Sequence, residues 1–157
     1  MADDDLFTPT ISTARRPGAL AKPWKLGSQF WVAFFGGPIA AGVIAFLNGR
    51  RLALTDRKRR LMLATGAAGF FVGIGAAAAL KGLDLGGTPA RLGNQIAGVL
   101  AYLVLYRLQR PADRVYVFYG SEEKDEDEAY DSLWGPGLAA VFGLGLPSAL
   151  VIAGLTD

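Results

Sequence analysis

Residues 50–60 read Arg50-Arg51-Leu52-Ala53-Leu54-Thr55-Asp56-Arg57-Lys58-Arg59-Arg60, and this basic segment decides how the rest of the chain is arranged. It lies between two apolar runs without a charge, Phe30 to Leu47 with 18 residues and Leu61 to Leu80 with 20. Each run can cross a hydrocarbon core of about 30 Å at about 1.5 Å per residue. Short loops rich in Lys and Arg stay in the cytoplasm during insertion, so the segment is predicted to be cytoplasmic. The topology-determining cations are Arg50, Arg51, Arg57, Lys58, Arg59 and Arg60.

The composition favours a membrane protein over a soluble domain. Of the 157 residues, 52% are hydrophobic and 19% charged, and the mean hydropathy is +0.30. The charges gather in the N-terminal tail, in the basic segment and between Arg107 and Asp131, which leaves four apolar blocks almost bare. A soluble helix needs charges along one face to keep that face wet. We therefore expect an all-α integral membrane protein, a small bundle of about four transmembrane helices.

The predicted organisation is a polar N-terminal tail over residues 1–28 and a single transmembrane domain over residues 29–157. Within that domain, helices are predicted at about 30–47, 61–80, 92–108 and 134–155, with an acidic connection over 109–132. Trp24 and Trp31 flank the entry to the first helix, where indole rings commonly lie at headgroup depth.

Several kinds of chemistry are excluded or disfavoured by residue types that the chain lacks. It contains no Cys and no His, so disulfides, thiolate or imidazole metal sites and imidazole-based catalysis are excluded. A net charge of +2 is too small to favour nucleic acid as a partner. No Asp, Glu, Lys or Arg lies in the middle of a block, which disfavours ion-coupled transport. We expect neither an enzyme nor a cofactor or metal site.

Small residues recur on one face of the predicted helices and indicate close helix packing. Gly69 and Gly73 form a GxxxG spacing, which lets two backbones approach. Such spacings also arise by chance, since Gly and Ala make up half of this block. The predicted helix-packing residues are Gly36, Gly37, Pro38, Gly66, Gly69, Gly73, Gly93 and Ala97.

Two groups of polar residues have alternative interpretations. Asn94 and Gln95, inside the third block, are favoured as hydrogen-bond partners between helices, and the alternative is that they line a polar path. The acidic run lacks the ligand spacing of a calcium loop and is favoured as a solvated charge run. Its alternative role is to dock a basic partner, through Glu122, Glu123, Asp125, Glu126, Asp127 and Glu128.

The orientation leaves two alternatives for the first block. With four crossings, both termini lie outside, and ten Lys and Arg lie in the cytoplasm against six outside. If Gly36-Gly37-Pro38 instead splits the block into a re-entrant pair of half-helices, the count becomes fourteen against two. We favour four crossings, because 18 residues split in two give arms of only about 12 Å each.

The stretch Phe35-Gly36-Gly37-Pro38-Ile39-Ala40-Ala41-Gly42, followed by Asn48 and the basic segment, resembles a GGPxAxG-type first membrane segment. Such segments occur in small uncharacterised bacterial multi-pass membrane proteins. The resemblance covers the first half of the chain and implies a few-helix fold in the bacterial inner membrane. It implies no activity and no functional residues.

Two functions from different classes agree with these features. The favoured one is a non-catalytic accessory or assembly subunit that packs against other membrane helices or against itself, with membrane lipids around it. The alternative is a small transporter or channel that oligomerises to enclose a path. Copurification of larger, different subunits favours the first function, whereas a homo-oligomer with water-accessible Asn94 and Gln95 favours the second.

Overall fold

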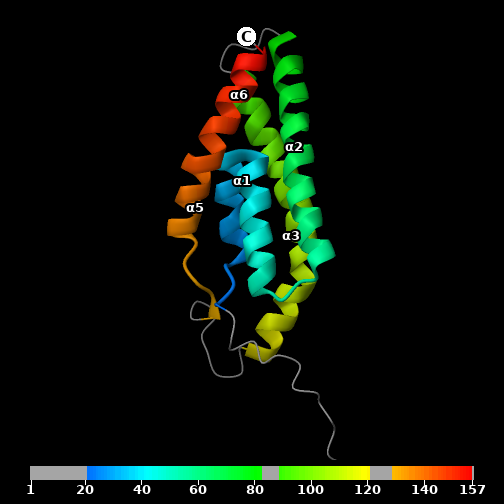
Figure 1. Ribbon diagram of the computed structural model, residues 1–157, viewed down its shortest axis with the longest axis vertical. Coiled ribbons are helices and arrows are strands. Elements are labelled where there is room, and N and C mark those ends of the chain that lie inside the picture. The colour runs from blue at the N-terminus through cyan, green and yellow to red at the C-terminus, as the bar shows by residue number, and fades with distance from the viewer. Residues whose placement is uncertain (1–20, 83–88, 121–128, 157) are drawn as a thin grey trace, which may run out of the picture.

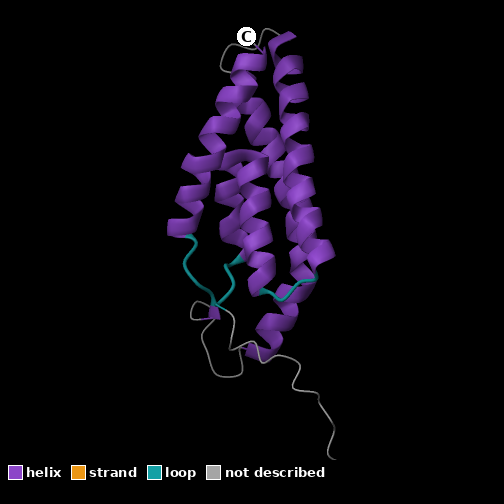
Figure 2. Ribbon diagram, viewed as in Figure 1, coloured by secondary structure: helices purple, strands orange, loops and turns teal. Residues whose placement is uncertain are grey.

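The computed structural model describes residues 21–82, 89–120 and 129–156, and all long elements in these ranges are helices joined by short loops (Figures 1 and 2). The predicted all-α class is therefore confirmed. The elements are η2 (Leu26–Ser28), α1 (Gln29–Arg51), α2 (Asp56–Gly82), α3 (Pro89–Gly120), α5 (Trp134–Ala140), η3 (Val141–Gly145) and α6 (Leu146–Thr156). Three stretches are long and apolar enough to cross a membrane by length and composition: Leu26–Arg51, Asp56–Gly82 and Trp134–Leu155.

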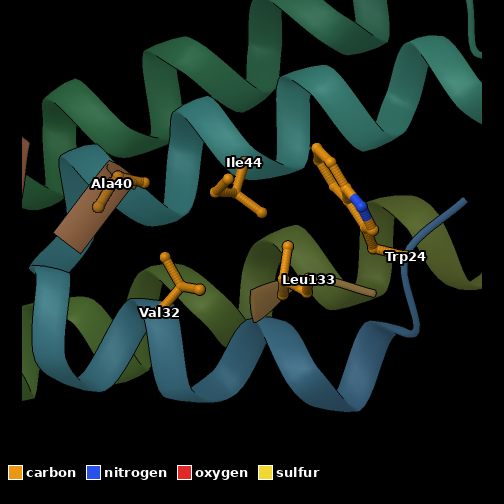
Figure 3. Packing of buried hydrophobic residues seen from close by; sticks show 6 residues of the cluster. Trp24, Val32, Ala40, Ile44 and Leu133 are labelled. Atoms are coloured by element: carbon orange, nitrogen blue, oxygen red, sulfur yellow. The ribbon is translucent and has the colours of Figure 1, made fainter. Parts of the chain in front are cut away.

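Helix α1 is not straight, because it folds back on itself at Gly37. This residue has φ +72° and ψ −170°, far from helical values. The backbone N–H of Trp24 donates to Oδ1 of Asn48 at 2.7 Å, although a straight helix would separate these residues by about 36 Å. Residues 26–36 therefore form a first arm and residues 38–51 a second arm, which run antiparallel (Figure 3). We call Gly36, Gly37 and Pro38 the hairpin tip.

This hairpin differs from the favoured prediction of one crossing helix over residues 30–47, and it has the shape of the alternative, a pair of half-helices. The predicted arms of about 12 Å are too short because that prediction divides only the apolar run in two. The first arm begins with η2 at Leu26, and the second arm continues through Arg51, which makes the second arm about 21 Å long.

The long helices cover the hairpin and extend beyond it (Figure 1). Helices α2 and α3 run antiparallel side by side, and α5, η3 and α6 follow one another as a third column. Helix α3 continues to Gly120, well past the predicted end at residue 108. Both ends of the hairpin lie where α2 begins and α3 ends, and we call this the basic end (Figure 1). The opposite end holds the end of α2 at Gly82, the start of α3 at Pro89 and the end of α6 at Thr156.

The hairpin is the core of the molecule. Of its apolar span, 56% is buried, against 22% for each of the two other spans. One buried cluster joins both arms to the third column, with Val32 facing Ile44 and Leu133 between the arms (Figure 3). A second cluster joins the hairpin to α2 and α3 through Met62 and Leu105. Beyond the tip, Ile152 of α6 is fully buried and lies close to Gly73 of α2.

Candidate functional site

Glycines of α2 bring that helix into direct backbone contact with the second arm. A Cβ atom added to Gly42 would lie 2.9 Å from the Cα of Gly66, and one added to Gly66 would lie 2.9 Å from the carbonyl oxygen of Pro38. A Cβ on Gly69 would lie 2.6 Å from the Cβ of Pro38. No side chain larger than hydrogen fits between these two helices here. The predicted packing residues Gly66 and Gly69 therefore hold the hairpin tip.

Glycines of the other two columns cover backbone carbonyls near the break. An added Cβ on Gly145 of η3 would lie 2.5 Å from the Cα of Gly36 and 2.8 Å from its carbonyl oxygen. An added Cβ on Gly98 of α3 would overlap the carbonyl oxygen of Ala33. Pro38 has no N–H, so the first arm loses one helical donor where it ends. The bare backbones of Gly98 and Gly145 therefore lie directly against the carbonyls of Ala33 and Gly36.

Asn94 is the polar side chain at the tip. It is 4% exposed, and a Cβ added to Gly37 would lie 2.5 Å from its Nδ2 and 2.7 Å from its Cγ. Its Oδ1 is buried and has no hydrogen-bond partner among the described residues. Gln95, about 100° further around α3, is half-buried. The structure therefore brings Asn94 to the break, whereas Gln95 points in another direction from the same helix.

A buried network of side-chain amides closes the base of the hairpin. Asn48 accepts from the backbone N–H of Trp24 at 2.7 Å, and its Nδ2 donates to Oε1 of Gln109 at 2.9 Å and to the carbonyl oxygen of Trp24 at 3.3 Å. Nε2 of Gln109 donates to Oε1 of Gln29 at 3.1 Å. The three side chains are buried. Because Gln29 and Asn48 belong to opposite arms, Gln109 ties both arms to α3.

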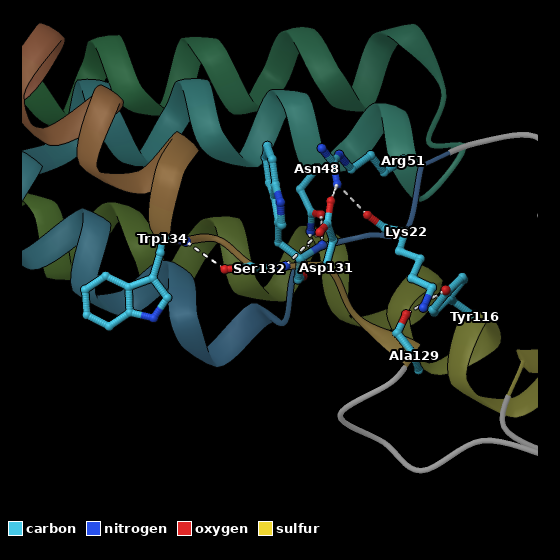
Figure 4. A network of polar contacts seen from close by, with 9 residues as sticks. Lys22, Asn48, Arg51, Tyr116, Ala129, Asp131, Ser132 and Trp134 are labelled. Carbon is cyan, nitrogen blue, oxygen red and sulfur yellow. Dashed lines mark hydrogen bonds and ion pairs between the residues drawn. The ribbon is translucent and has the colours of Figure 1, made fainter.

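An ionic contact at the basic end links the hairpin to the start of the third column (Figure 4). Arg51 donates to Oδ2 of Asp131 at 2.8 Å and to the carbonyl oxygen of Lys22 at 2.6 Å. Its guanidinium lies over the Trp24 ring, 4.0 Å from the centroid. The hydrogen bond from Arg51, with a second from the Ser132 backbone, lowers the pKa of the Asp131 carboxyl below its ordinary value. Arg51, predicted only as a topology signal, thus also holds chain segments together.

The remaining predicted packing residues lie where α2 meets α3 and α6. A Cβ on Gly93 would lie 2.7 Å from the backbone nitrogen of Ala77 and 2.8 Å from the carbonyl oxygen of Gly73. A Cβ on Gly73 would lie 3.3 Å from Cδ1 of Ile152 and 3.5 Å from the Cβ of Ala97. These small residues therefore all pack against other helices of the same chain.

The other predicted cations and carboxylates stand apart from the tip. Arg50, Arg57, Lys58 and Arg60 are exposed, and Arg59 pairs with Asp56 and lies over the Phe46 ring. The six candidate docking carboxylates between residues 121 and 128 lie outside the described residues.

Sequence reasoning missed the amide network, although its members stand at recognisable places. Asn48 directly follows the first apolar run, and Gln29 directly precedes it. Gln109 follows the third predicted helix. Amide side chains at both boundaries of one apolar run, with a third beside another run, are the signal that could have indicated that the two boundaries meet.

The chemistry that the tip offers is narrow. The three atoms nearest to a Cβ added at Gly37 all belong to the Asn94 side chain, and those at Gly36 belong to Ala40 and Val141. The tip therefore presents backbone carbonyls and the Asn94 amide, which can position helices or accept hydrogen bonds.

Comparisons of the chain with protein-family models, with curated proteins and with solved structures each return no match.

Proposed function

We propose that the chain is a multi-pass integral membrane protein of the bacterial inner membrane. In this arrangement α2, α3 and the α5–η3–α6 column cross the bilayer, and α1 enters and leaves it from the cytoplasmic side. Arms of about 16 and 21 Å reach roughly the middle of a hydrocarbon core of about 30 Å. The bacterial location rests on the resemblance of residues 35–42 to bacterial membrane segments.

The charge distribution supports this orientation. Among the described residues, two cations, Lys81 and Arg91, lie at the opposite end, and eleven lie toward the basic end. Those eleven are Lys22, Lys25, Arg50, Arg51, Arg57, Lys58, Arg59, Arg60, Arg107, Arg110 and Arg114. The positive-inside rule then places the basic end in the cytoplasm. Over the same thirteen cations, a four-crossing arrangement would give only nine against four, because Lys22 and Lys25 would then lie outside.

The outer surface between the two ends also supports a lipid environment. Large apolar side chains are exposed on α2, α3 and the third column, far beyond the single patch that a water-soluble monomer usually shows. They include Phe71, Val72, Leu103, Phe142, Leu150 and Leu155.

Within the membrane, we assign the protein the role of a non-catalytic accessory or assembly subunit that packs against other membrane helices. The observation that carries this role is a second small-residue face on α2, which no other part of the described chain covers. Its members, all exposed and within an arc of about 80°, are Ala64, Ala68, Gly75 and Ala79, with Val72 among them. Small residues on a lipid-exposed helix let another helix approach closely. The inner glycines of α2 are already used by the chain itself, so the outer face is the one left for a partner.

The test replaces Gly75 by Leu. An added Cβ at Gly75 has no atom within 4 Å, and Leu favours a helix more than Gly, so the variant is expected to fold. We expect Gly75→Leu to lose partner subunits, or its own second copy, on purification in mild detergent. The matched control is Gly143→Leu on η3, where an added Cβ also has no atom within 4 Å. A wild-type protein that is monomeric and alone in mild detergent contradicts the role.

A second candidate function, a small oligomeric transporter or channel, is favoured by the break at Gly37 beside the unpaired Oδ1 of Asn94. Broken helices near the membrane midplane are a recurrent feature of transporter sites. Accessibility separates the two functions. Asn94→Cys and Gln95→Cys labelled by a water-soluble maleimide in a homo-oligomer support transport, whereas protection of both, with different subunits bound, supports the assembly role.

A further inference from the structure

Four exposed cations surround the point where α1 passes into α2. We call them the cationic turn, and they are Arg50, Arg57, Lys58 and Arg60. Within the described part of the chain, none of their side chains makes a hydrogen bond or an ion pair. The carboxylates that approach this segment are already used, because Asp131 pairs with Arg51 and Asp56 pairs with Arg59. The charge of the four cations is therefore uncompensated by the described residues.

The backbone that carries these cations is fixed. The N–H of Leu52 donates to the carbonyl oxygen of Asn48 at 2.9 Å, and the N–H of Leu54 donates to that of Gly49 at 2.8 Å. The Leu52 side chain is buried. A Cβ added to Gly49 would lie 3.3 Å from Cγ of Arg59, so the end of α1 lies against the first turns of α2. A ligand of the cationic turn therefore meets a preformed backbone and orders side chains only.

The position of the cations on α2 costs stability in the absence of an anion. Arg57, Lys58 and Arg60 all lie within the first five residues of this helix, where positive charge opposes the helix dipole. In the first turn, Asp56 is the acidic residue that complements the dipole. Arg57 and Arg60 are also three residues apart and are therefore neighbours of like charge on the helix surface. An anion supplied from outside the chain would relieve both effects.

An exposed apolar face continues from these cations along α2. Leu63 and Phe71, which are 39% and 70% exposed, lie within an arc of about 80° that also contains Arg60. From Arg60 to Phe71 the helix rises by about 16 Å, which is about half of a hydrocarbon core of about 30 Å. The face thus joins a cationic end to an apolar length that matches one leaflet. A molecule with an anionic head and an apolar chain has the complementary pattern.

We propose that the cationic turn binds the headgroup of an anionic phospholipid of the cytoplasmic leaflet. The phosphate lies between Arg57 and Arg60, and an acyl chain follows Leu63 and Phe71. The proposal rests on the membrane arrangement proposed above. It gives these cations a ligand in addition to their effect on orientation, at a site beside the outer small-residue face of α2 and away from the hairpin tip.

The first experiment measures selectivity for the headgroup. The full chain is purified in mild detergent, mixed with equal amounts of phosphatidylglycerol and phosphatidylcholine that have the same acyl chains, and analysed by native mass spectrometry. We expect phosphatidylglycerol to be retained in preference to phosphatidylcholine. Equal retention of the two lipids would overturn the site, because the cations would then make no difference to binding.

The variants locate the binding on α2. Arg60→Gln is expected to weaken retention of phosphatidylglycerol about fivefold, and Arg57→Gln combined with Arg60→Gln about 25-fold, at the strength of one cation each beside an anionic surface. Arg60→Lys keeps the charge and is expected to keep most of the preference. The matched control is Arg91→Gln, which removes an exposed cation at the opposite end. An equal loss in Arg91→Gln would show that net charge, and not the cationic turn, retains the lipid.

Thermal unfolding in detergent separates a binding role from a structural one. Without added lipid, the double variant is expected to melt at or above the temperature of wild type, since it loses charges that oppose the helix dipole. Phosphatidylglycerol is expected to raise the melting temperature of wild type but not of the double variant. A double variant that melts lower without lipid would show that these arginines hold the fold, which contradicts the proposal.

Two further probes test the occupant. Inorganic phosphate at the same concentration is expected to leave the melting temperature unchanged, and stabilisation equal to that by phosphatidylglycerol would make free phosphate the ligand. A photo-crosslinker placed at Leu63 in intact membranes is expected to capture lipid, and capture of a polypeptide would overturn the lipid site. Alkaline carbonate extraction distinguishes the two levels of failure. A protein that stays in the membrane pellet but shows no lipid preference loses only this site, whereas a protein released by carbonate loses the membrane arrangement as well.

Discussion

At the scale of single residues, two constraints meet at Gly37. Its φ of +72° with ψ of −170° belongs to a region of backbone space that residues with a Cβ essentially never adopt. The space around it is also closed, because the Asn94 side chain lies where a Cβ would stand. Pro38 adds to the break by removing a helical donor. Conformation and packing therefore both require glycine at the point where the hairpin turns.

We predict that Gly37→Ala destabilises the protein by about 2 to 4 kcal/mol, from backbone strain of about 1 to 3 kcal/mol together with the clash at Asn94. Thermal unfolding in detergent measures the loss, and Gly143→Ala, at an open position, is the control. Adding Asn94→Ala removes the clash but not the strain, so the double variant should recover only part of the loss. Full recovery would mean that packing alone excludes a side chain.

Asp131 gives a pH prediction at the same scale. Its pKa is lowered in the folded protein, chiefly by the hydrogen bond from Arg51, so the contact contributes stability above the unfolded pKa near 3.8. That stability is lost as the pH falls through the lower folded pKa, because the protonated carboxyl no longer attracts Arg51. We expect wild type to be more stable than Asp131→Asn at pH 6, with the two stabilities converging below about pH 3.8. Parallel stability curves over this pH range would show that the pair contributes nothing in solution.

At the scale of elements, hydropathy predicted where the long helices lie but not how the first one runs. The runs at 61–80 and 134–155 correspond to α2 and to the column from Trp134 to Thr156, because an uninterrupted apolar run of that length has few alternatives to a helix. A fold-back at Gly37 is disfavoured by the apolar run alone, because half of its 18 residues gives an arm too short for a hairpin. What stabilises the hairpin lies at the ends of that run, in contacts of Asn48 and Arg51 that join residues 24 to 80 positions apart. The hydropathy of a single run does not reveal such contacts, because their partners lie in distant parts of the chain.

Two substitutions in α2 test whether a single small residue on its inner face contributes to stability. A Cβ added to Gly73 would lie 3.3 Å from Cδ1 of Ile152, which is tighter than an ordinary contact, and 3.5 Å from the Cβ of Ala97, so a leucine there would push α6 or α3 away. Phe71 is 70% exposed on the same helix and should accept leucine without repacking. We predict that Gly73→Leu lowers the melting temperature in detergent by several degrees and that Phe71→Leu leaves it unchanged. If both variants melt with wild type, the inner face is only a compositional feature of a Gly-rich and Ala-rich helix.

At the scale of the whole molecule, the hairpin explains why α2, α3 and the third column pack differently at the two ends of the long axis. Near the basic end, the two arms fill the space between the columns, and beyond the tip α6 closes directly on α2 and α3 through Ile152. A hairpin of this length can serve as the core only if its two ends return to the same side. The amide network of Asn48, Gln29 and Gln109 enforces that return.

The return of the hairpin gives a topological prediction that distinguishes it from a straight first helix. We expect single-cysteine variants of this Cys-free chain at Lys22 and Thr55 to resist an impermeant maleimide in intact cells, and variants at Lys81 and Leu155 to react. Lys22 is the informative position, because a straight first crossing would place it opposite Thr55 and expose it to the reagent. The other three positions have the same expected result in both arrangements and serve as internal standards. Labelling of Lys22→Cys before lysis, with Thr55→Cys protected, would show that the two arms separate in the membrane, despite the 2.7 Å hydrogen bond between Trp24 and Asn48.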